Sequence, residues 1–370
     1  MSCSKTDADW MSDALNLARQ GLFTTGKNPR VGCVIVKDHQ QIAEGWHQFA
    51  GQRHAEAEAL YQCQVPEKLR GATAYVTLEP CSHHGKTPPC ADALIQAGVS
   101  RVVIGHLDPN PQVNGQGATR LREAGIDVET GVLEHACRSL NPGFIQRFEQ
   151  GRPYVRVKIA CSLDGKIALK SGESQWITNA QAREDTQRYR ARSDAIISGS
   201  GTFYMDNPSF TVRPQTWRHG QYPDVKMVRQ PDRIIVSRYA PKPNSFSNTL
   251  FTDSLGCIWA SHERSEAMPA GVDHWPLSEP KSALSSLYEK LVEAGYNELW
   301  FEAGPKLTSQ VLRTGWWDEL IVYQAPVLLG EQAINMVDFT LDRLVNAVPL
   351  QLIEQRWVGD NQRLRFTPKM

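Results

Sequence analysis

The sequence lacks a net charge, a long apolar run and a secretory leader. Lys and Arg together number 40, and so do Asp and Glu, so we expect no nucleic-acid partner and no membrane-surface partner. No run approaches the ~18 apolar residues of a transmembrane helix. The N-terminal stretch MSCSKTDADWMSD is too polar and acidic for a signal peptide. These absences predict a cytoplasmic protein whose partners are small molecules.

Cysteine is also scarce, with eight in 370 residues, which favours free thiols or metal ligands over a disulfide framework. No G-x-G-x-x-G follows a predicted strand, which argues against an ordinary Rossmann dinucleotide site. Two cysteines nevertheless lie close together in EPCSHHGKTPPC, residues 79–90. That cluster is the candidate for a metal site.

Helical and extended patterns alternate twice along the chain. The first series predicts helices at 8–21, 54–63, 91–98, 117–125 and 133–141, and strands at 31–36, 72–78 and 101–109. The second begins at Tyr154 and ends in two strands at 350–357 and 363–369. Asn-Pro-Gly and Gly-Arg-Pro breaks make 141–155 the expected junction, and 214–232 reads as a long surface loop. We therefore predict two α/β domains, 1–145 and 152–370, the second with a mainly parallel sheet.

A histidine and a carboxylate earlier in the sequence complete the candidate metal site at Cys81 and Cys90. Cys81 follows a predicted strand, Cys90 opens a predicted helix, and His54 begins another helix with Glu56 two residues on. One His and two Cys leave the fourth zinc position to water, as in catalytic sites. The set matches H-x-E followed by P-C-x-x-C, the zinc deaminase signature, in which zinc activates water and the Glu shuttles its proton.

The spacing of the two cysteines departs from that signature. Eight residues, SHHGKTPP, separate Cys81 from Cys90 where the signature has two. We expect this insertion to loop over the site, so that its His, Lys and Thr side chains touch substrate. His83 or His84 could instead replace a metal ligand. Four other cysteines are predicted to be ordinary core or surface thiols: Cys33, Cys63, Cys137 and Cys161.

Eight motifs together resemble one family, the bacterial bifunctional riboflavin-biosynthesis deaminase–reductases. NPRVGCVIV, HAEAEAL, VTLEPCSHHGKTPPC and DPNPQVNGQG resemble the deaminase half, and KIACSLDGKIA, SGESQWIT, DNPSFTVR and FEAGPKL resemble the reductase half. The resemblance implies a cytidine-deaminase-like three-layer α/β/α domain at 1–145 and a dihydrofolate-reductase-like α/β domain at 152–370. It implies zinc-dependent deamination of 2,5-diamino-6-ribosylamino-4(3H)-pyrimidinone 5′-phosphate, then NADPH-dependent reduction of its ribosyl group to ribityl.

The resemblance also implies roles for individual residues. In the deaminase half, Glu56 is the catalytic residue, the zinc ligands are His54, Cys81 and Cys90, and substrate contacts are Asn28, His83 and Lys86. In the reductase half, NADPH would lie along the glycine loops GSGT (199–202) and EAGPKL (302–307) and contact Ala160, Trp176, Thr202, Asp206, Ser237, Gly304, Pro305, Lys306 and Leu307. Substrate contacts would be Ser174, Arg190, Phe210, Arg213 and Glu302, with the two arginines as bidentate donors to the ribose phosphate.

Other interpretations remain open on the residues alone. Lys158 and Asp164 could serve the reductase site or only hold a loop. A tRNA or other nucleic-acid deaminase shares the zinc chemistry, but the neutral charge disfavours it. A non-catalytic structural zinc module fused to a binding domain would need a fourth protein ligand such as His83 or His84. We further expect a homo-oligomer, which no residue pattern by itself specifies.

Overall fold

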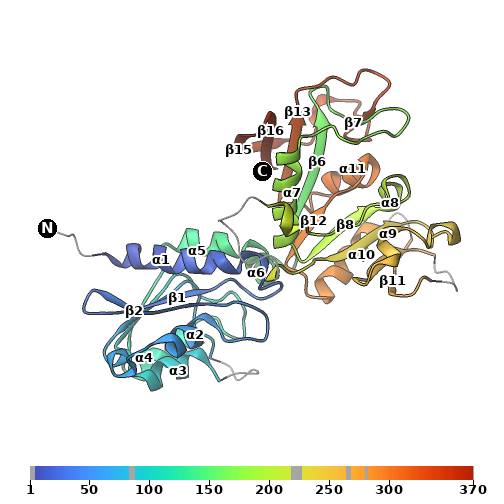
Figure 1. Cartoon of the computed structure of the whole chain (residues 1–370). Coiled ribbons are helices and arrows are strands. Elements are labelled where there is room, and N and C mark those ends of the chain that lie inside the picture. The colour runs from blue at the N-terminus through green and yellow to red at the C-terminus, as the bar shows by residue number, and fades with distance from the viewer. Residues whose placement is uncertain (1–4, 83–87, 218–226, 264–267, 280–281, 370) are drawn as a thin grey trace. The chain divides into compact units, whose positions relative to one another are not determined.

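The computed structural model of the chain describes residues 5–82, 88–217, 227–263, 268–279 and 282–369. The chain divides into two compact units, the first formed by the residues up to Arg152 together with 227–228 and the second by the other described residues from Pro153 onward. Each is an α/β unit with its own sheet (Figure 1). Within the described residues, every helix is too short or too polar to cross a membrane.

The first unit is built on a five-stranded sheet in the order β2-β1-β3-β4-β5. Its strands are β1 (Gly32–Lys37), β2 (Gln40–Trp46), β3 (Thr73–Val76), β4 (Arg101–Ile104) and β5 (Asp127–Thr130). Strand β1 runs antiparallel to both neighbours, whereas β3, β4 and β5 are parallel. One face carries α1 (Asp7–Gln20) and α5 (Glu134–Leu140), and the other carries α2 (Ala55–Gln62), α3 (Cys90–Ala97) and α4 (Gln116–Glu123) (Figure 1). The expected three-layer α/β/α architecture is confirmed.

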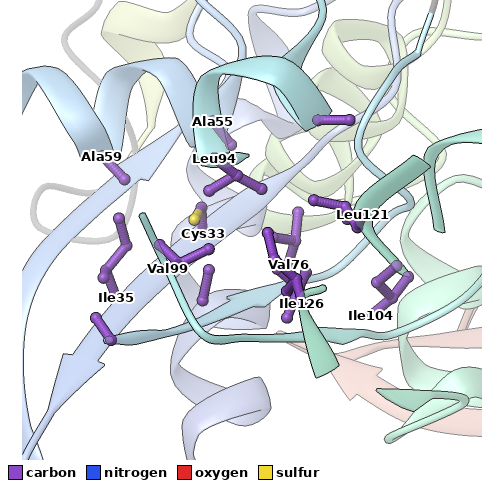
Figure 2. Close-up of a cluster of buried hydrophobic side chains, with 14 of the residues drawn as sticks. Cys33, Ile35, Ala55, Ala59, Val76, Leu94, Val99, Ile104, Leu121 and Ile126 are labelled. Carbon is purple, nitrogen blue, oxygen red and sulfur yellow. The ribbon is translucent and has the colours of Figure 1, made fainter. Parts of the chain in front are cut away.

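Strand β1 is apolar on both sides because helices cover both faces of the sheet. Val34 and Val36 pack in the cluster formed with α1 and α5. Cys33 and Ile35 point to the opposite side, toward α2 and α3, where Leu94 packs with them (Figure 2). Burial raises the pKa of the Cys33 thiol, so this cysteine is a core residue, as predicted.

The second unit contains a nine-stranded sheet in the order β11-β10-β9-β8-β12-β6-β13-β16-β15. Seven strands are parallel: β6 (Tyr154–Ser162), β8 (Ala195–Gly199), β9 (Asp232–Ser237), β10 (Cys257–Ser261), β11 (Val272–Pro276), β12 (Glu298–Phe301) and β13 (Glu319–Ala325). Two antiparallel strands, β16 (Asn361–Pro368) and β15 (Leu350–Val358), complete one edge. The predicted parallel sheet with a C-terminal strand pair is confirmed.

The helices of the second unit are α7 (Ala180–Arg192), α8 (Ser200–Asp206), α9 (Thr249–Thr252), α10 (Ala283–Glu293) and α11 (Pro305–Thr314). A small two-stranded sheet pairs β7 (Lys166–Ala168) with β14 (Ile334–Asn335). Both segments expected to be glycine loops lead directly into helices, since Gly199 precedes α8 and Gly304 precedes α11. The expectation of short loops was therefore wrong for 200–202 and 305–307, which are helical, whereas 302–304 do connect β12 to α11 without helix or strand.

The stretch 141–155 was expected to be an irregular junction, but it contains the helix α6 (Pro142–Gln150). Proline is favoured at the first position of a helix, where its missing N–H has no partner to lose. Gly151 ends the helix in the left-handed conformation, with φ at 69°. The same residues that suggested a break are thus the start and stop signals of a helix. Residues 218–226 of the loop expected at 214–232 lie outside the described residues, and the described part includes a short 3₁₀ turn at Pro214–Thr216.

Candidate active sites

Three side chains with zinc-ligand chemistry converge in the first unit. His54 precedes α2, Cys81 follows the β3 segment, and Cys90 opens α3. The His54 Nδ1 lies 3.6 Å from the Cys81 Sγ and 3.4 Å from the Cys90 Sγ, and all three ligand atoms lie within 4.8 Å of one another. Tetrahedral zinc with Zn–S of ~2.3 Å and Zn–N of ~2.05 Å gives N···S separations of about 3.6 Å. The donor set therefore fits zinc.

The surroundings of Cys81 favour the ionised form of its thiol. The Cys90 side chain is the largest influence on Cys81 and, together with His54, lowers the pKa of the Cys81 thiol to about 4 against the effect of burial. The backbone N–H of Cys90, at the start of α3, also donates to the Cys81 sulfur at 3.4 Å. Helix N-termini favour negative charge. Cys81 is thus prepared to act as a thiolate ligand.

Glu56 lies in the first turn of α2, two residues after His54, and its side chain is only 3% exposed. Burial raises the pKa of this carboxyl to about 7, although the nearby His54 opposes the shift. A group with such a pKa can both accept and release protons near neutral pH. Glu56 is therefore suited to the proton-shuttle role expected from the sequence.

Asn28 is held close to this cluster by His47, a residue that the sequence analysis did not single out. The His47 Nδ1 lies 3.0 Å from the carbonyl oxygen of Arg53, which can only accept, so Nδ1 carries the proton. The His47 Nε2 then accepts from the Asn28 amide at 3.2 Å, which fixes the direction of the Asn28 oxygen. The rings of His47 and His54 meet edge to face at 5.6 Å. The predicted contacts His83 and Lys86 lie outside the described residues.

Glu79 holds the backbone that carries Cys81. Its carboxylate is buried and accepts N–H groups of Asp108 at 3.0 Å, Gly115 at 2.9 Å and Ala118 at 3.0 Å. Gly115 is the N-cap of α4 and Ala118 lies in its first turn, where a carboxylate caps N–H groups that have no helical partner. The chain entering the metal cluster is therefore tied to both the β4–α4 loop and α4.

The second unit contains a cavity of about 550 Å³ at the carboxyl ends of its central strands. From β6 the chain proceeds to β8 and outward through β9 to β11, then returns to β12 and continues to β13 on the other side of β6. Ligands of open parallel sheets bind outside the carboxyl ends of the strands where the strand order reverses in this way. The cavity thus occupies the expected position for a cofactor and substrate site.

Most of the predicted reductase residues line this cavity. They are Ala160, Trp176, Thr202, Asp206 and Gly304 from the cofactor set, and Ser174, Arg190, Phe210, Arg213 and Glu302 from the substrate set. Among the described lining residues, four predicted cofactor contacts do not appear: Ser237, Pro305, Lys306 and Leu307. Ser237 ends β9, and the other three form the first turn of α11.

Arg190 and Glu302 form a two-pronged ion pair at the cavity. The Arg190 Nε and Nη2 donate to the Glu302 carboxylate at 2.6 and 2.7 Å, and Nη1 donates to the Thr211 carbonyl at 3.2 Å. Burial alone would raise the pKa of Glu302, but Arg190 and Lys158 lower it to about 2. The Arg190 fork therefore already binds Glu302, and the phosphate contacts expected of Arg190 and Arg213 stay predictions.

The sequence did not decide whether Lys158 and Asp164 serve the reductase site or hold a loop. The structure places them in different surroundings. Lys158 lines the cavity, where burial lowers the pKa of its amine while Glu302 opposes the shift. Asp164 accepts the Ser162 hydroxyl at 2.5 Å and the backbone N–H of Gly330 at 2.8 Å. Lys158 is thus a site residue that the sequence analysis did not commit to, and Asp164 holds a loop.

The two sites together define a class of protein, a zinc-dependent deaminase joined to a reductase. Residues 4–106 match the cytidine and deoxycytidylate deaminase zinc-binding region, and residues 153–357 match the RibD C-terminal domain. The chain is 46% identical to the riboflavin biosynthesis protein RibD of Escherichia coli K12 over 366 residues, covering 95% of this chain and 97% of that protein.

Solved structures agree with these matches. One form of Acinetobacter baumannii RibD is 40% identical, with a TM-score of 0.90, covering 98% of this chain and 99% of that one. The diaminohydroxyphosphoribosylaminopyrimidine deaminase/5-amino-6-(5-phosphoribosylamino)uracil reductase of Thermotoga maritima is 32% identical, with a TM-score of 0.86 and the same coverage. The chain therefore belongs to the RibD family of riboflavin biosynthesis proteins. It is a deaminase and reductase that uses zinc and NADPH.

Proposed function

We propose that the first unit deaminates 2,5-diamino-6-ribosylamino-4(3H)-pyrimidinone 5′-phosphate and that the second reduces the ribosyl group of the product to ribityl. The observation that carries this proposal is the presence, on one chain, of the His54, Cys81 and Cys90 cluster beside Glu56 and of a separate cavity containing Arg190 and Glu302. The T. maritima relative is named for both of these activities.

In the deaminase unit, the three ligand side chains would hold zinc, which supplies an activated water to the carbon that bears the amino group. Glu56 can accept a proton from that water, deliver one to the ring nitrogen and protonate the departing ammonia. The fixed Asn28 amide can orient the pyrimidine. Burial of Glu56 keeps these proton transfers away from bulk solvent.

In the reductase unit, NADPH would supply the hydride. The two helix starts leave their backbone open to the cofactor, because a Cβ at Gly201 would meet nothing within 4 Å and one at Gly304 only the Thr202 Oγ1 at 3.8 Å. Glycine turns at helix N-termini are suited to phosphate groups. Lys158 and Glu302 present a donor and an acceptor to the substrate from the same cavity.

The direct test is to incubate the purified protein with the ribosylamino-pyrimidine phosphate and to follow ammonia release and NADPH absorbance separately. Release of ammonia and loss of NADPH absorbance are both expected. Absence of ammonia would exclude the proposed deamination, and ammonia without NADPH oxidation would exclude the proposed reduction.

The seven described cysteines are free, which together with the use of NADPH supports the cytoplasm as the place of action.

Arg213→Ala is expected to raise the KM for the pyrimidine substrate of the reductase by about 10- to 100-fold, since a hydrogen bond to a charged group contributes ~1.5–3 kcal/mol. The loop that carries Arg213 is held independently, by Gln187, which accepts the Arg213 N–H at 2.8 Å, and by Gln230, which bonds both backbone groups of Val212. The KM for NADPH should stay within about twofold, as measured by initial rates.

The matched control is Arg313→Ala, which removes an exposed arginine from the last turn of α11. It should leave both constants unchanged. An equal rise of both constants in Arg213→Ala would show that this residue was assigned to the wrong ligand.

We also propose that the protein is a homo-oligomer in which β15 meets a second copy of the chain. This edge strand exposes Leu350, Leu352, Ile353 and Trp357, and an exposed apolar edge is a pairing surface. Trp357→Glu is expected to lower the molar mass measured by light scattering, whereas Tyr61→Glu, a change at an exposed ring on α2, should not. A monomeric wild type would refute the proposal.

A further inference from the structure

Trp300 lies on β12, two residues before Glu302, and no role described so far uses it. Its side chain is fully buried, and its indole N–H donates to the Glu302 Oε1. Alternate residues of a strand point to the same face, which is why the two side chains meet. Two other buried tryptophans of this unit instead donate to backbone carbonyls, Trp259 to Tyr239 at 2.9 Å and Trp317 to Leu312 at 3.0 Å. The Trp300 N–H is thus directed at a cavity carboxylate.

Trp300 on β12 and Glu302, the residue that directly follows β12, meet two successive residues of α7. The Trp300 ring stacks on the Tyr189 ring with 5.0 Å between centroids and 8° between planes. Arg190, the next residue on the helix, binds both oxygens of Glu302. The stacked rings therefore hold helix and strand in register at the point where the carboxylate is bound.

The hydrogen bonds to Glu302 leave its carboxylate little freedom to rotate. A carboxylate offers about four acceptor positions. Among the described residues, Oε1 accepts from Arg190 and Trp300, and Oε2 accepts from Arg190. One position on Oε2 is left for a hydroxyl or N–H of the substrate, and the indole N–H stops the carboxylate from turning it away.

We propose that Trp300 is a positioning residue of the reductase, which fixes the plane of the Glu302 carboxylate against the substrate. This inference rests on the proposed reductase function. Three cationic side chains also influence this region: Lys158 on β6, Arg190 on α7 and Arg213 in the loop that follows α8. Because the cations that keep Glu302 ionised remain when the indole is removed, the expected loss is one of orientation.

The test is Trp300→Phe in the full-length, zinc-loaded enzyme, with the already deaminated pyrimidine supplied directly. We expect kcat for NADPH oxidation to fall about tenfold or more, since misplacement of a reacting group by ~1 Å can cost up to 10². The KM for NADPH should stay within about twofold, and ammonia release from the first substrate should not change. A Trp300→Phe enzyme with wild-type kcat would overturn the proposal.

Two comparisons separate positioning from stability. Trp317→Phe also removes a buried indole and its N–H. It should therefore lower the unfolding temperature about as much as Trp300→Phe does, but it should keep the wild-type kcat. Equal losses of kcat in the two variants would overturn the proposal. Glu302→Gln should also lower kcat, and adding Trp300→Phe to it should cost little more, because the two residues act through one carboxylate. Fully additive losses would contradict that coupling.

The proposal remains testable if Trp300→Phe does not fold. Tyr189→Leu removes the stacked ring, keeps the indole, and should lower kcat with the KM for NADPH unchanged; an unchanged kcat there would count against the proposal. Failure of the proposed function itself is distinct, because the wild-type enzyme would then show no NADPH oxidation with the deaminated pyrimidine.

Discussion

Replacement of Cys81 by Ser is expected to remove zinc from the protein and to reduce ammonia release to background. The Cys81 thiol is the ligand whose pKa the structure lowers to about 4, whereas a serine hydroxyl stays protonated at neutral pH and is a poor zinc ligand. The remaining His54 and Cys90 offer only two ligands, too few for a catalytic zinc site. Zinc content by atomic emission and ammonia release by a coupled assay measure the two effects on the same preparation.

The matched control is Cys63→Ser, which changes a cysteine of the same unit outside the metal cluster, at the C-terminal end of α2. It should retain zinc and deaminate. In Cys81→Ser, NADPH oxidation with the deaminated pyrimidine should persist, because the described residues that line the reductase cavity belong to the second unit. A zinc-free Cys81→Ser protein that still released ammonia would disprove the metal assignment.

The metal cluster could be predicted from the sequence because each ligand lies at the end of a helix or strand that is itself recognisable. His54 precedes a helix, Cys90 opens one, and Cys81 follows a strand. Parallel strands and their connecting helices bring such ends to one edge of a sheet. His47 carries no such signal, since its contacts with Asn28 and Arg53 arise only from the folded chain.

Helix α7 shows why much of the second site could not be predicted from local pattern. Its sequence AQAREDTQRYRAR has the charge density of a solvated face, yet Asp185 and Gln187 are buried. Asp185 accepts the Tyr323 hydroxyl and the Arg363 guanidinium, each at 2.7 Å. Those partners lie 138 and 178 residues away in the chain. Polar residues paired over such separations leave no periodic signal.

The pairing of Arg190 with Glu302 is hidden for the same reason. The resemblance assigned both residues to the substrate, but it does not show that the arginine already binds the carboxylate through two donors. Nor does it indicate Trp300, which in a strand such as ELWF would be read as an ordinary core residue. Family motifs thus locate the cavity, whereas the hydrogen bonds among its residues require the structure.

Glu56→Gln is expected to separate the two activities. The substitution keeps the size and shape of the side chain but removes the group that can take a proton. A positioned general base contributes ~10²–10⁴-fold, and here one residue serves several proton transfers, so ammonia release should fall by at least that factor. Zinc should stay bound, because His54, Cys81 and Cys90 are unchanged. Zinc content and ammonia release are measured on the same sample.

The reductase provides the internal control for that variant. Glu56 belongs to the first unit, whereas Arg190, Glu302 and the other described residues that line the cavity belong to the second. NADPH oxidation with the deaminated pyrimidine should therefore proceed at the wild-type rate. Glu58→Gln, a change of another carboxylate on the same helix, should affect neither step. If Glu56→Gln retains zinc and native stability yet loses the reductase step on that substrate, the assignment of two chemically independent sites is wrong.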